Sequence, residues 1–330
     1  SKSFAERQRL FNLPRSSWED YNVKLISKGG GIYPRSVKSI DLTTEAKLAL
    51  GIDPEVSSLT PNELLTKILL APVDLLWNGG IGTYIKSTTE THAQVGDKAN
   101  DAIRINGGDI RARVIGEGGN LGATQLGRIE AARAGVKLNT DAIDNSAGVD
   151  TSDHEVNIKI LLDQAVTAGM LSVDDRNKQL AVMTDEVGEL VLRDNYEQNL
   201  ILVQARYQDA EMLRVHKRLI NHLEDEGLLN RAIEYLPTDA QLDSLHAQGM
   251  GLTSPELSVL MAYVKIDLSK DLAADEIVNE KWCREVLQNY FPSDLRVKYA
   301  DLMDTHPLRK EIISTVLTND VVNRGGITFT

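Results

Sequence analysis

The sequence has little of what marks several common classes of protein. Only one of its 330 residues is a cysteine, Cys283, which excludes an intrachain disulfide and leads us to expect the reducing cytoplasm. Aromatic residues make up 5%, and no apolar run is long enough to cross a membrane. The 36 basic residues are outnumbered by 48 acidic ones, giving a formal charge of -12. This balance argues against nucleic acid and an anionic membrane as partners.

Signatures of several enzyme classes are also missing. No Cys/His cluster has the spacing of a zinc site, so we expect no metal. No G-x-S-x-G elbow precedes a helix, so an esterase nucleophile has no support. His154 and Glu155 are adjacent, which is not the spacing of a metalloprotease helix. We expect His154 to be an ordinary polar residue at a helix N-terminus.

The stretch 112–159 carries the main structural pattern. It reads as a strand at Val114-Ile115, a glycine-rich loop, a helix at 123–134 and a second short strand at 136–138, with another glycine-containing loop around Asn145. Strand, loop, helix and strand in this order predict an α/β sheet with parallel strands. Ligands of such sheets bind at the carboxyl ends of the strands, where both loops fall.

Two earlier apolar runs also end in glycines. The run 23–26 precedes Gly29, Gly30 and Gly31, and we interpret this loop as a tight connection more readily than as a phosphate site. The run 72–77 follows a helix predicted at 60–71 by a capping box, and it precedes Asn78, Gly79 and Gly80. The polar segment 87–103 also has a helical composition, and we leave open a turn or helix end at 95–101. The strand-end loops therefore offer backbone and amide groups, which suit holding a cofactor better than acid–base catalysis.

The spacing of Gly116, Gly118 and Gly122 approaches a dinucleotide fingerprint. The third glycine stands one residue late, so a phosphate loop is the less favoured reading. Asp141 and Asp144 lie near the distance of a ribose-binding acid. Glu117 is either a buried acid or the cap of the following helix.

Beyond residue 150 the pattern becomes helical. A capping box at Ser152–Glu155 predicts a helix to about residue 168, and further helices follow Ser172, Thr238 and Ser254. We expect the last helix at 307–318. The fold predicted is a partial Rossmann-like parallel sheet over 1–150, followed by an all-helical domain over 151–330.

The strings GEGGNLGATQLGRIEAA and NTDAIDNSAGVDTSDHEVNIK resemble the large NAD-specific glutamate dehydrogenases of bacteria. The resemblance continues through ISKGGGIYPRSVKSIDL, APVDLLWNGGIGTYIK, LTSPELSVLMAYVKI and LRKEIISTVLTNDVVNRGG, and covers essentially the whole chain. It implies NAD as cofactor, and L-glutamate and 2-oxoglutarate as substrate and product. It also implies a homo-oligomeric full-length protein.

The resemblance also suggests roles for individual residues. Smaller glutamate dehydrogenases place an E-G-A-N block and an N-A-G-G-V block beside the nicotinamide and its ribose. By this comparison the cofactor-binding residues are Asn78, Gly79, Gly80, Gly118, Asn120 and Asn145. Val149 and Ser152 would approach the side-chain carboxylate of the substrate. The departure of Asn78-Gly79-Gly80 from the family's Pro-Ala-Ala-like turn makes that part of the assignment weaker.

The family's dinucleotide fingerprint and its catalytic lysine and aspartate are upstream of these blocks. We therefore assign no catalytic residue here, and expect a cofactor-side and C-terminal fragment that is inactive in isolation. Two alternatives stay open. One is another amino-acid dehydrogenase, and the other is a non-catalytic module for oligomerisation or regulation.

Overall fold

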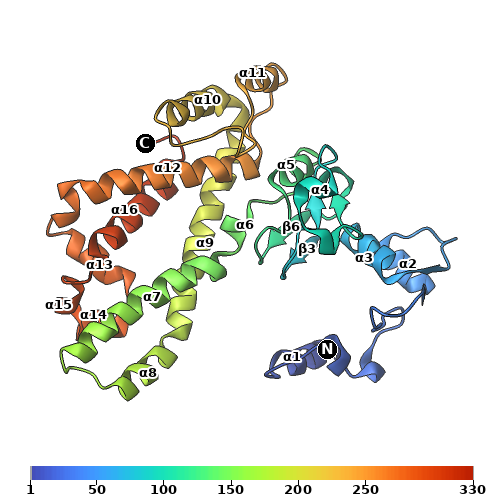
Figure 1. Ribbon diagram of the computed structural model, residues 1–330, viewed down its shortest axis with the longest axis horizontal. Coiled ribbons are helices and arrows are strands. Elements are labelled where there is room, and N and C mark those ends of the chain that lie inside the picture. Colours follow the sequence, from blue (N-terminus) through green and yellow to red (C-terminus); the bar gives the residue numbers. More distant parts are fainter. Residues whose placement is uncertain (1, 330) are drawn as a thin grey trace.

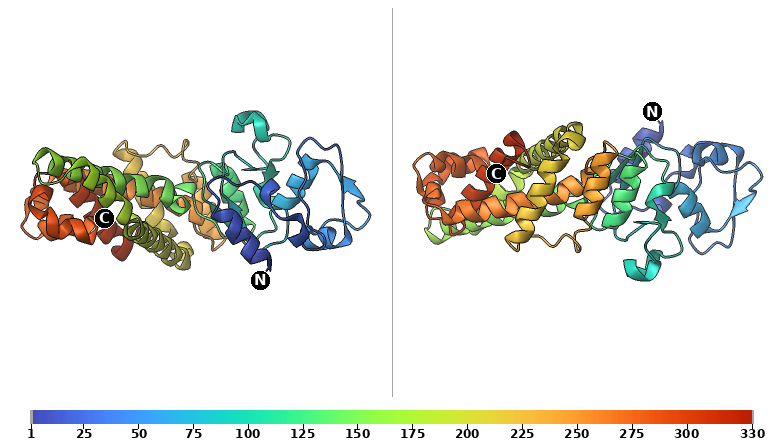
Figure 2. Two further views of the ribbon diagram at one scale, coloured as in Figure 1. Left: turned by 90° about the horizontal axis from the view of Figure 1, so that it is seen from below. Right: turned by 90° about the horizontal axis from the view of Figure 1, so that it is seen from above.

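A computed structural model describes residues 2–329 and shows an elongated molecule with a strand-bearing part and a helical part (Figures 1 and 2). The strand-bearing part contains α1 (Lys2–Phe11), β1 (Ile40–Asp41), α2 (Thr44–Leu50), β2 (Ser58–Leu59), α3 (Pro61–Leu69), β3 (Leu75–Asn78), β4 (Ile85–Lys86), α4 (His92–Val95), β5 (Ile105–Asn106), β6 (Val114–Glu117), α5 (Gln125–Arg133) and α6 (Asp141–Asp144). The helical part contains α7 (Ser146–Thr167), α8 (Val173–Val182), α9 (Thr184–Tyr207), α10 (Asp209–Asp225), α11 (Asp239–Ala247), α12 (Ser254–Ala274), α13 (Cys283–Tyr290), α14 (Ser293–Lys298), α15 (Ala300–Met303) and α16 (Arg309–Gly325). The predicted fold class, α/β followed by helices, is confirmed.

The expected parallel sheet is present as short pairs. β3 and β6 run parallel with Asn78 opposite Glu117, and β4 and β5 form a second parallel pair. The expected strand at 136–138 contributes one parallel bridge, from Lys137 to Val114. Buried aliphatic residues, including Ile105 and Ile115, fill the space between these pairs and α5. The carboxyl ends of β3 and β6 therefore face the same side.

Local signals fixed several helix starts. In α3 the Thr60 hydroxyl accepts from Glu63 N at 3.3 Å, and the Glu63 carboxylate accepts from Thr60 N at 2.8 Å. Side chains of Ser172 and Thr238 cap α8 and α11. Each cap satisfies a backbone N–H that the first helical turn leaves free. These predicted starts are confirmed.

The helical part is built around two apolar cores. In one, α9, α10, α11 and α12 bury aliphatic side chains such as Leu213 and Leu257. In the other, α7, α13, α14 and α16 surround Phe291, which is fully buried. The long helices α12 and α16 pack against each other, as do α7 and α9 (Figure 1).

Polar contacts join the two parts where α5 meets α12. Arg133 donates to Gly251 O at 2.9 Å and lies 3.3 Å from the buried Glu256 carboxylate. Burial raises the pKa of Glu256, and the Thr253 cap and Arg133 act in the opposite direction. The Ser254 hydroxyl donates to Asn139 Oδ1 at 2.7 Å. The two parts therefore meet through directional contacts.

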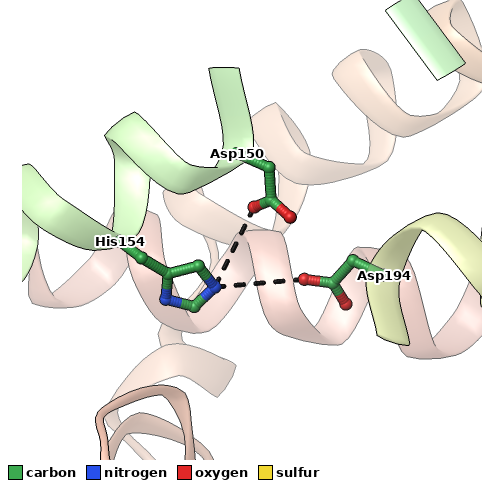
Figure 3. A group of neighbouring side chains, drawn as sticks. All are labelled: Asp150, His154 and Asp194. Carbon is green, nitrogen blue, oxygen red and sulfur yellow. Dashed lines mark ion pairs between the residues drawn. The ribbon is translucent and has the colours of Figure 1, made fainter. Parts of the chain in front are cut away.

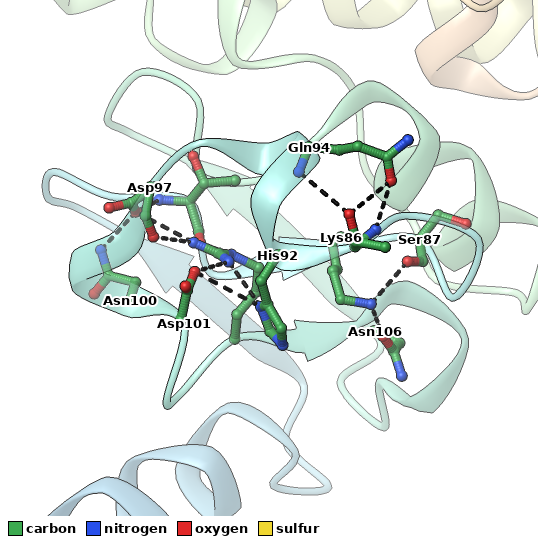
Figure 4. A network of polar contacts seen from close by, with 11 residues as sticks. Lys86, Ser87, His92, Gln94, Asp97, Asn100, Asp101 and Asn106 are labelled. Atoms are coloured by element: carbon green, nitrogen blue, oxygen red, sulfur yellow. Dashed lines mark hydrogen bonds and ion pairs between the residues drawn. The ribbon is translucent and has the colours of Figure 1, made fainter.

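Two expected elements are wrong. The run 23–26 is not a strand, because Val23–Leu25 form a 3-10 turn capped by Asn22. Residues 87–103 are not one helix, because only His92–Val95 are α-helical. Several polar side chains of this segment instead make hydrogen bonds within a loop, among them Asp97 and Asn100, which Figure 4 shows. Asp101 and the Asp97 carbonyl accept from the buried Arg104. The Arg104 guanidinium donates to Thr83 O at 2.7 Å and to Asp101 Oδ1 at 2.6 Å.

The expected start of the helix at Ser152 is also wrong. Helix α7 begins at Ser146, where the Asn145 side chain accepts from Gly148 N. Ser152 lies inside the helix and its hydroxyl donates to Gly148 O at 3.3 Å. The last helix likewise runs further than 307–318, and the predicted domain boundary at 150 falls within α7, so that division stays a prediction. Over residues 2–329, no helix combines the length and the apolar character that crossing a membrane requires.

Candidate functional site

The loops after β3 and β6 meet at one edge of the strand-bearing part. Gly118 N and Gly119 N both donate to Asn78 O, at 2.8 and 3.2 Å. A Cβ on Gly119 would lie 2.6 Å from Gly80 O, so only glycine permits this approach. The structure thus brings together Asn78, Gly79, Gly80 and Gly118, as the sequence predicted.

The two asparagines singled out from the sequence are in contact. Asn145 Nδ2 donates to Asn120 Oδ1 at 2.8 Å, while Asn145 Oδ1 caps α7 by accepting from Gly148 N at 3.1 Å. Asn120 is exposed beside Leu121, whose φ of 58° is left-handed. The turn after β6 and the N-terminus of α7 are therefore joined by side-chain amides.

Beneath this turn lies a network of buried charges. Arg128 makes a bidentate pair with Glu117, with distances of 2.6 and 2.9 Å, and both side chains are buried. Arg128 also lies 3.1 Å from Asp141. Burial alone would lower the pKa of Arg128, but Glu117 and Asp141 raise it overall. Such a pair fixes the orientation of both side chains, and it holds Glu117 under the loop.

Asp141 and Asp144 face this loop and hold its backbone. Asp141 Oδ2 accepts from Leu121 N at 2.7 Å, and Asp144 Oδ2 accepts from Glu117 N at 3.0 Å. Burial raises the pKa of Asp144. Both carboxylates therefore accept hydrogen bonds from the backbone of the loop. The sequence suggested a ribose-binding acid at this place and did not reveal these contacts.

The loop is poorly suited to phosphate. Between Glu117 and Thr124, six backbone N–H groups already donate within the protein: those of Glu117, Gly118, Gly119, Leu121, Ala123 and Thr124. Ala123 N, for example, donates to Glu117 Oε2 at 3.1 Å. Phosphate loops need free N–H groups and a positive field, whereas this loop surrounds carboxylates. The glycines here serve close backbone packing.

A cavity of about 240 Å³ opens beside the end of β3. Trp77, Leu76 and Tyr84 contribute to its mostly apolar wall, and Asn78, Gly79 and Gly80 also line it. Of the described residues that line it, only Arg35 and Glu117 carry charge. Asn120 and Asn145 are not part of this lining. An apolar wall with a few amides suits a flat ring, and the volume is too small for a whole dinucleotide.

The two residues predicted to face the substrate lie on the first turns of α7. Val149 is 62% exposed and Ser152 is exposed as well. Neither is among the described residues that line the cavity beside β3. Their role as substrate contacts stays a prediction.

Sequence reasoning missed the buried cations of this part. Arg128 lies on α5 and donates to Glu117, which stands 11 residues earlier in the chain. Arg104 donates to Asp101 in the preceding loop. A signal was available, since an arginine inside an otherwise apolar helix face needs an acid partner. Nothing in the sequence, however, identifies which of the acids it meets.

Known proteins provide independent information about the chain. Residues 1–205 match the family model described as bacterial NAD-glutamate dehydrogenase, catalytic domain, and residues 249–330 match glutamate dehydrogenase, C-terminal. The chain is 53% identical over 329 residues to an NAD-specific glutamate dehydrogenase of Pseudomonas aeruginosa, covering 100% of this chain and 20% of that protein. For the proteins of the same name from Halomonas elongata and Mycobacterium tuberculosis, identity is 52% over 327 and 50% over 331 residues, each covering 99% of this chain and 20% of the relative.

The chain thus spans about a fifth of the length of the curated relatives it matches. The first family model alone covers more than half of the chain, and the two together include both the strand-bearing and the helical part. The resemblance seen in the sequence is confirmed: the chain belongs to the bacterial NAD-glutamate dehydrogenase family.

Proposed function

We propose that this chain supplies the nicotinamide-facing edge of an NAD-dependent glutamate dehydrogenase, which converts L-glutamate, NAD and water to 2-oxoglutarate, ammonia and NADH. The meeting of the β3 and β6 loops beside a ring-sized cavity carries this proposal. NAD would serve as the hydride acceptor. The names of the relatives, NAD-specific glutamate dehydrogenases, support this choice of cofactor and substrate.

The residues present fit one end of the cofactor. Trp77 and the apolar lining would cover a ring face, and the amides of Asn78, Asn120 and Asn145 would orient the ring and its ribose by hydrogen bonds. The loop after β6 is poorly suited to bind the pyrophosphate, because most of its backbone N–H groups already donate hydrogen bonds within the protein. Val149 and Ser152, at the start of α7, would approach the glutamate side chain.

We propose further that this region positions groups and does not transfer protons. Glu117 is held by Arg128, and arginine is not deprotonated in proteins, so neither charged residue of the cavity lining is suited to acid–base work. The matched model carries the description of a catalytic domain, and residues 1–205 would be the cofactor-facing portion of that domain. The 330-residue chain alone should then show little glutamate-dependent formation of NADH. Robust turnover by this chain would contradict the assignment.

The cofactor role is best tested in a full-length enzyme that carries these residues. Asn120→Ala should raise the KM for NAD about tenfold, the effect of losing one hydrogen bond of roughly 1.4 kcal/mol, and leave the KM for glutamate unchanged. Asn62→Ala, on the exposed face of α3, is the matched control. An unchanged KM for NAD in Asn120→Ala would remove the cofactor role. Assaying the same enzyme with leucine and phenylalanine separates glutamate from other amino acids as substrate.

One observation favours an additional role of the helical part in assembly. Helix α9 exposes a row of large apolar side chains at helical spacing: Leu192, Tyr196, Leu200, Val203 and Tyr207. We propose that this face packs against another subunit of a homo-oligomer. Light scattering should show a lower mass for Leu192→Lys/Val203→Lys than for the unchanged chain, and equal masses would contradict the proposal.

We also propose a cytoplasmic location for the protein, which is supported by Cys283, a single buried cysteine without a disulfide.

A further inference from the structure

The helical part contains a second cavity, of about 640 Å³, far along the chain from the β3 and β6 loops. Helices α7, α9, α13 and α16 contribute its walls, and three of the lining residues are Asp150, His154 and Asp194. Asp150 and His154 are four residues apart and share one face of α7, whereas Asp194 comes from α9. Val149 and Ser152 are absent from this lining.

These three side chains converge around one ring nitrogen (Figure 3). His154 Nε2 lies 3.9 Å from Asp150 Oδ1 and 4.0 Å from Asp194 Oδ2. One donor atom from each residue lies within 4.8 Å of the other two. The separations are too long for hydrogen bonds, so the three groups face one another without direct contact.

His154 is a buried polar side chain without a hydrogen-bond partner. It is 4% exposed, its Nδ1 has no partner, and its Nε2 points between the two carboxylates. Its ring is stacked on Tyr290 at a centroid distance of 4.4 Å, which fixes the plane of the imidazole. Within residues 2–329 the ring makes no hydrogen bond, and Nε2 is the nitrogen that faces the two carboxylates, so Nε2 is the atom available to a ligand bound among them.

Two of the arginines that line the cavity form their ion pairs with acids outside the cluster. Arg193 is paired with Glu197 at 2.9 Å and Arg324 with Asp320 at 3.0 Å, while Asp153 adds a further negative charge to the cavity wall.

Lys265 of α12 is another nearby cation, and Asp194 and Glu197 both stabilise its charged form. Its ammonium group is buried without a hydrogen-bond partner, and burial lowers its pKa to about 8. Within residues 2–329 it makes no ion pair with either Asp150 or Asp194. The cluster therefore combines an imidazole without a hydrogen bond and two close carboxylates that, within residues 2–329, form no direct ion pair with a lysine or an arginine.

We propose that Asp150, His154 and Asp194 bind a divalent transition-metal cation, with Zn²⁺ preferred over Mn²⁺. Imidazole nitrogen and carboxylate oxygen are both ligands of Zn²⁺, and water from the cavity would complete the coordination. Bonds of about 2.0–2.1 Å place tetrahedral ligand atoms roughly 3.3 Å apart, so each carboxylate oxygen would need to approach His154 Nε2 by about 0.6–0.7 Å. Ca²⁺ and Mg²⁺ prefer all-oxygen sites. The cation would cross-link α7 to α9.

The sequence could not reveal this site, because its third ligand stands 40 residues after His154 on another helix. The expectation that the chain holds no metal was based on the absence of a Cys/His cluster. A mixed site made from one histidine and two aspartates has no such signature. The proposal does not depend on NAD or glutamate, so it can fail or succeed independently of the dehydrogenase assignment.

Calorimetric titration of the 330-residue chain tests the proposal after removal of metals with EDTA and dialysis. ZnCl₂ should bind with one equivalent, and MnCl₂ should bind more weakly, as the general order of metal affinities requires. Asp194→Asn and His154→Gln should each weaken Zn²⁺ binding by at least about tenfold, since loss of an outer-shell partner alone costs 10- to 100-fold. Asp150→Asn provides a third ligand variant, and circular dichroism identifies any variant that does not fold.

The matched control is Asp153→Asn, which removes the same charge from the wall of the same cavity outside the cluster. Its affinity for Zn²⁺ should stay within about twofold of the unchanged chain. Absence of Zn²⁺ binding would overturn the proposal. Equal weakening in Asp153→Asn would also overturn it, because that result indicates attraction by diffuse negative charge.

Discussion

The strand-bearing and helical parts are stabilised by different kinds of contact. Among the described residues, the strand-bearing part has an apolar cluster of nine buried residues, whereas the helical part has one of 14 and supplies all but Ile143 of another with 16. The strand-bearing part, with its smaller apolar cluster, also buries ionic side chains, among them Glu117, Arg128, Arg104 and Lys86. Apolar packing is non-directional, whereas an ion pair or hydrogen bond fixes the orientation of its partners.

This difference explains where ligand-facing loops are found. The turn after β6 has its shape because Asp141, Asp144 and Glu117 each accept from a particular backbone N–H. A loop specified by such contacts can present Asn120 and the glycines in one conformation. In the helical part, by contrast, the buried His154 faces the partly exposed Asp150 and Asp194 without a hydrogen bond, and this cluster requires a separate explanation.

The largest effect should come from breaking the ionic network. Arg128→Met leaves Glu117 buried without its partner, and we expect it to lower the free energy of unfolding by about 4 kcal/mol, in the range of 3–5 kcal/mol for buried pairs. Urea unfolding followed by circular dichroism measures this. The double variant Glu117→Leu/Arg128→Met should recover part of the loss, because both charges are then removed. If the double variant is less stable than Arg128→Met, the unpaired charge of Glu117 is not the main cause of the lost stability.

A large-to-small change in the helical core should have a somewhat smaller effect. Leu213→Ala, at a position 1% exposed, should cost about 3 kcal/mol, within the range of 2–5 kcal/mol for buried leucines. The control Leu192→Ala, at a position 70% exposed on α9, should stay within about 0.5 kcal/mol. Comparable losses in both variants would show that the face of α9 is covered in solution. The same urea titration decides between these outcomes.

The sequence predicted the features that depend on neighbouring residues or on strand order, and it missed those that depend on buried charges. Helix starts with their own caps, such as Thr60, were readable because both partners stand three residues apart. The end of β3 and the meeting of its glycines with the β6 loop followed from parallel-strand topology. The segment 87–103 was misread, because its polar side chains serve Arg104, whose burial the local pattern does not show. The start of α7 was misassigned by six residues because Asn145 competes with Ser152 as a cap, and only Asn145 has the required geometry.

Acid should affect the helical part through a buried histidine. Burial lowers the pKa of His216 to about 4, so between pH 6.5 and 4 the unfolded chain binds a proton that the folded chain does not. Stability from this group is complete above pH 6.5 and falls as the pH decreases. His216→Leu should therefore reduce the loss of stability between pH 8 and pH 5 by about 2 kcal/mol. Urea midpoints at several pH values measure it, and parallel curves for the two proteins would contradict it.

The smallest effects should come from the helix caps, where the two parts are alike. Thr60→Ala on α3 and Thr238→Ala on α11 each remove a hydroxyl that accepts from the backbone N–H three residues on. In both helices the backbone N–H of the N-cap residue also donates to the side chain three residues later, from Thr60 to Glu63 and from Thr238 to Gln241, at 2.8 Å in each case. Each substitution should cost about 1 kcal/mol. Because capping energy is local, the two values should agree within about 0.5 kcal/mol despite the different cores. A much larger cost for Thr60→Ala would mean that the cap also supports the β3 loops, and that the polar part unfolds as a unit of its own.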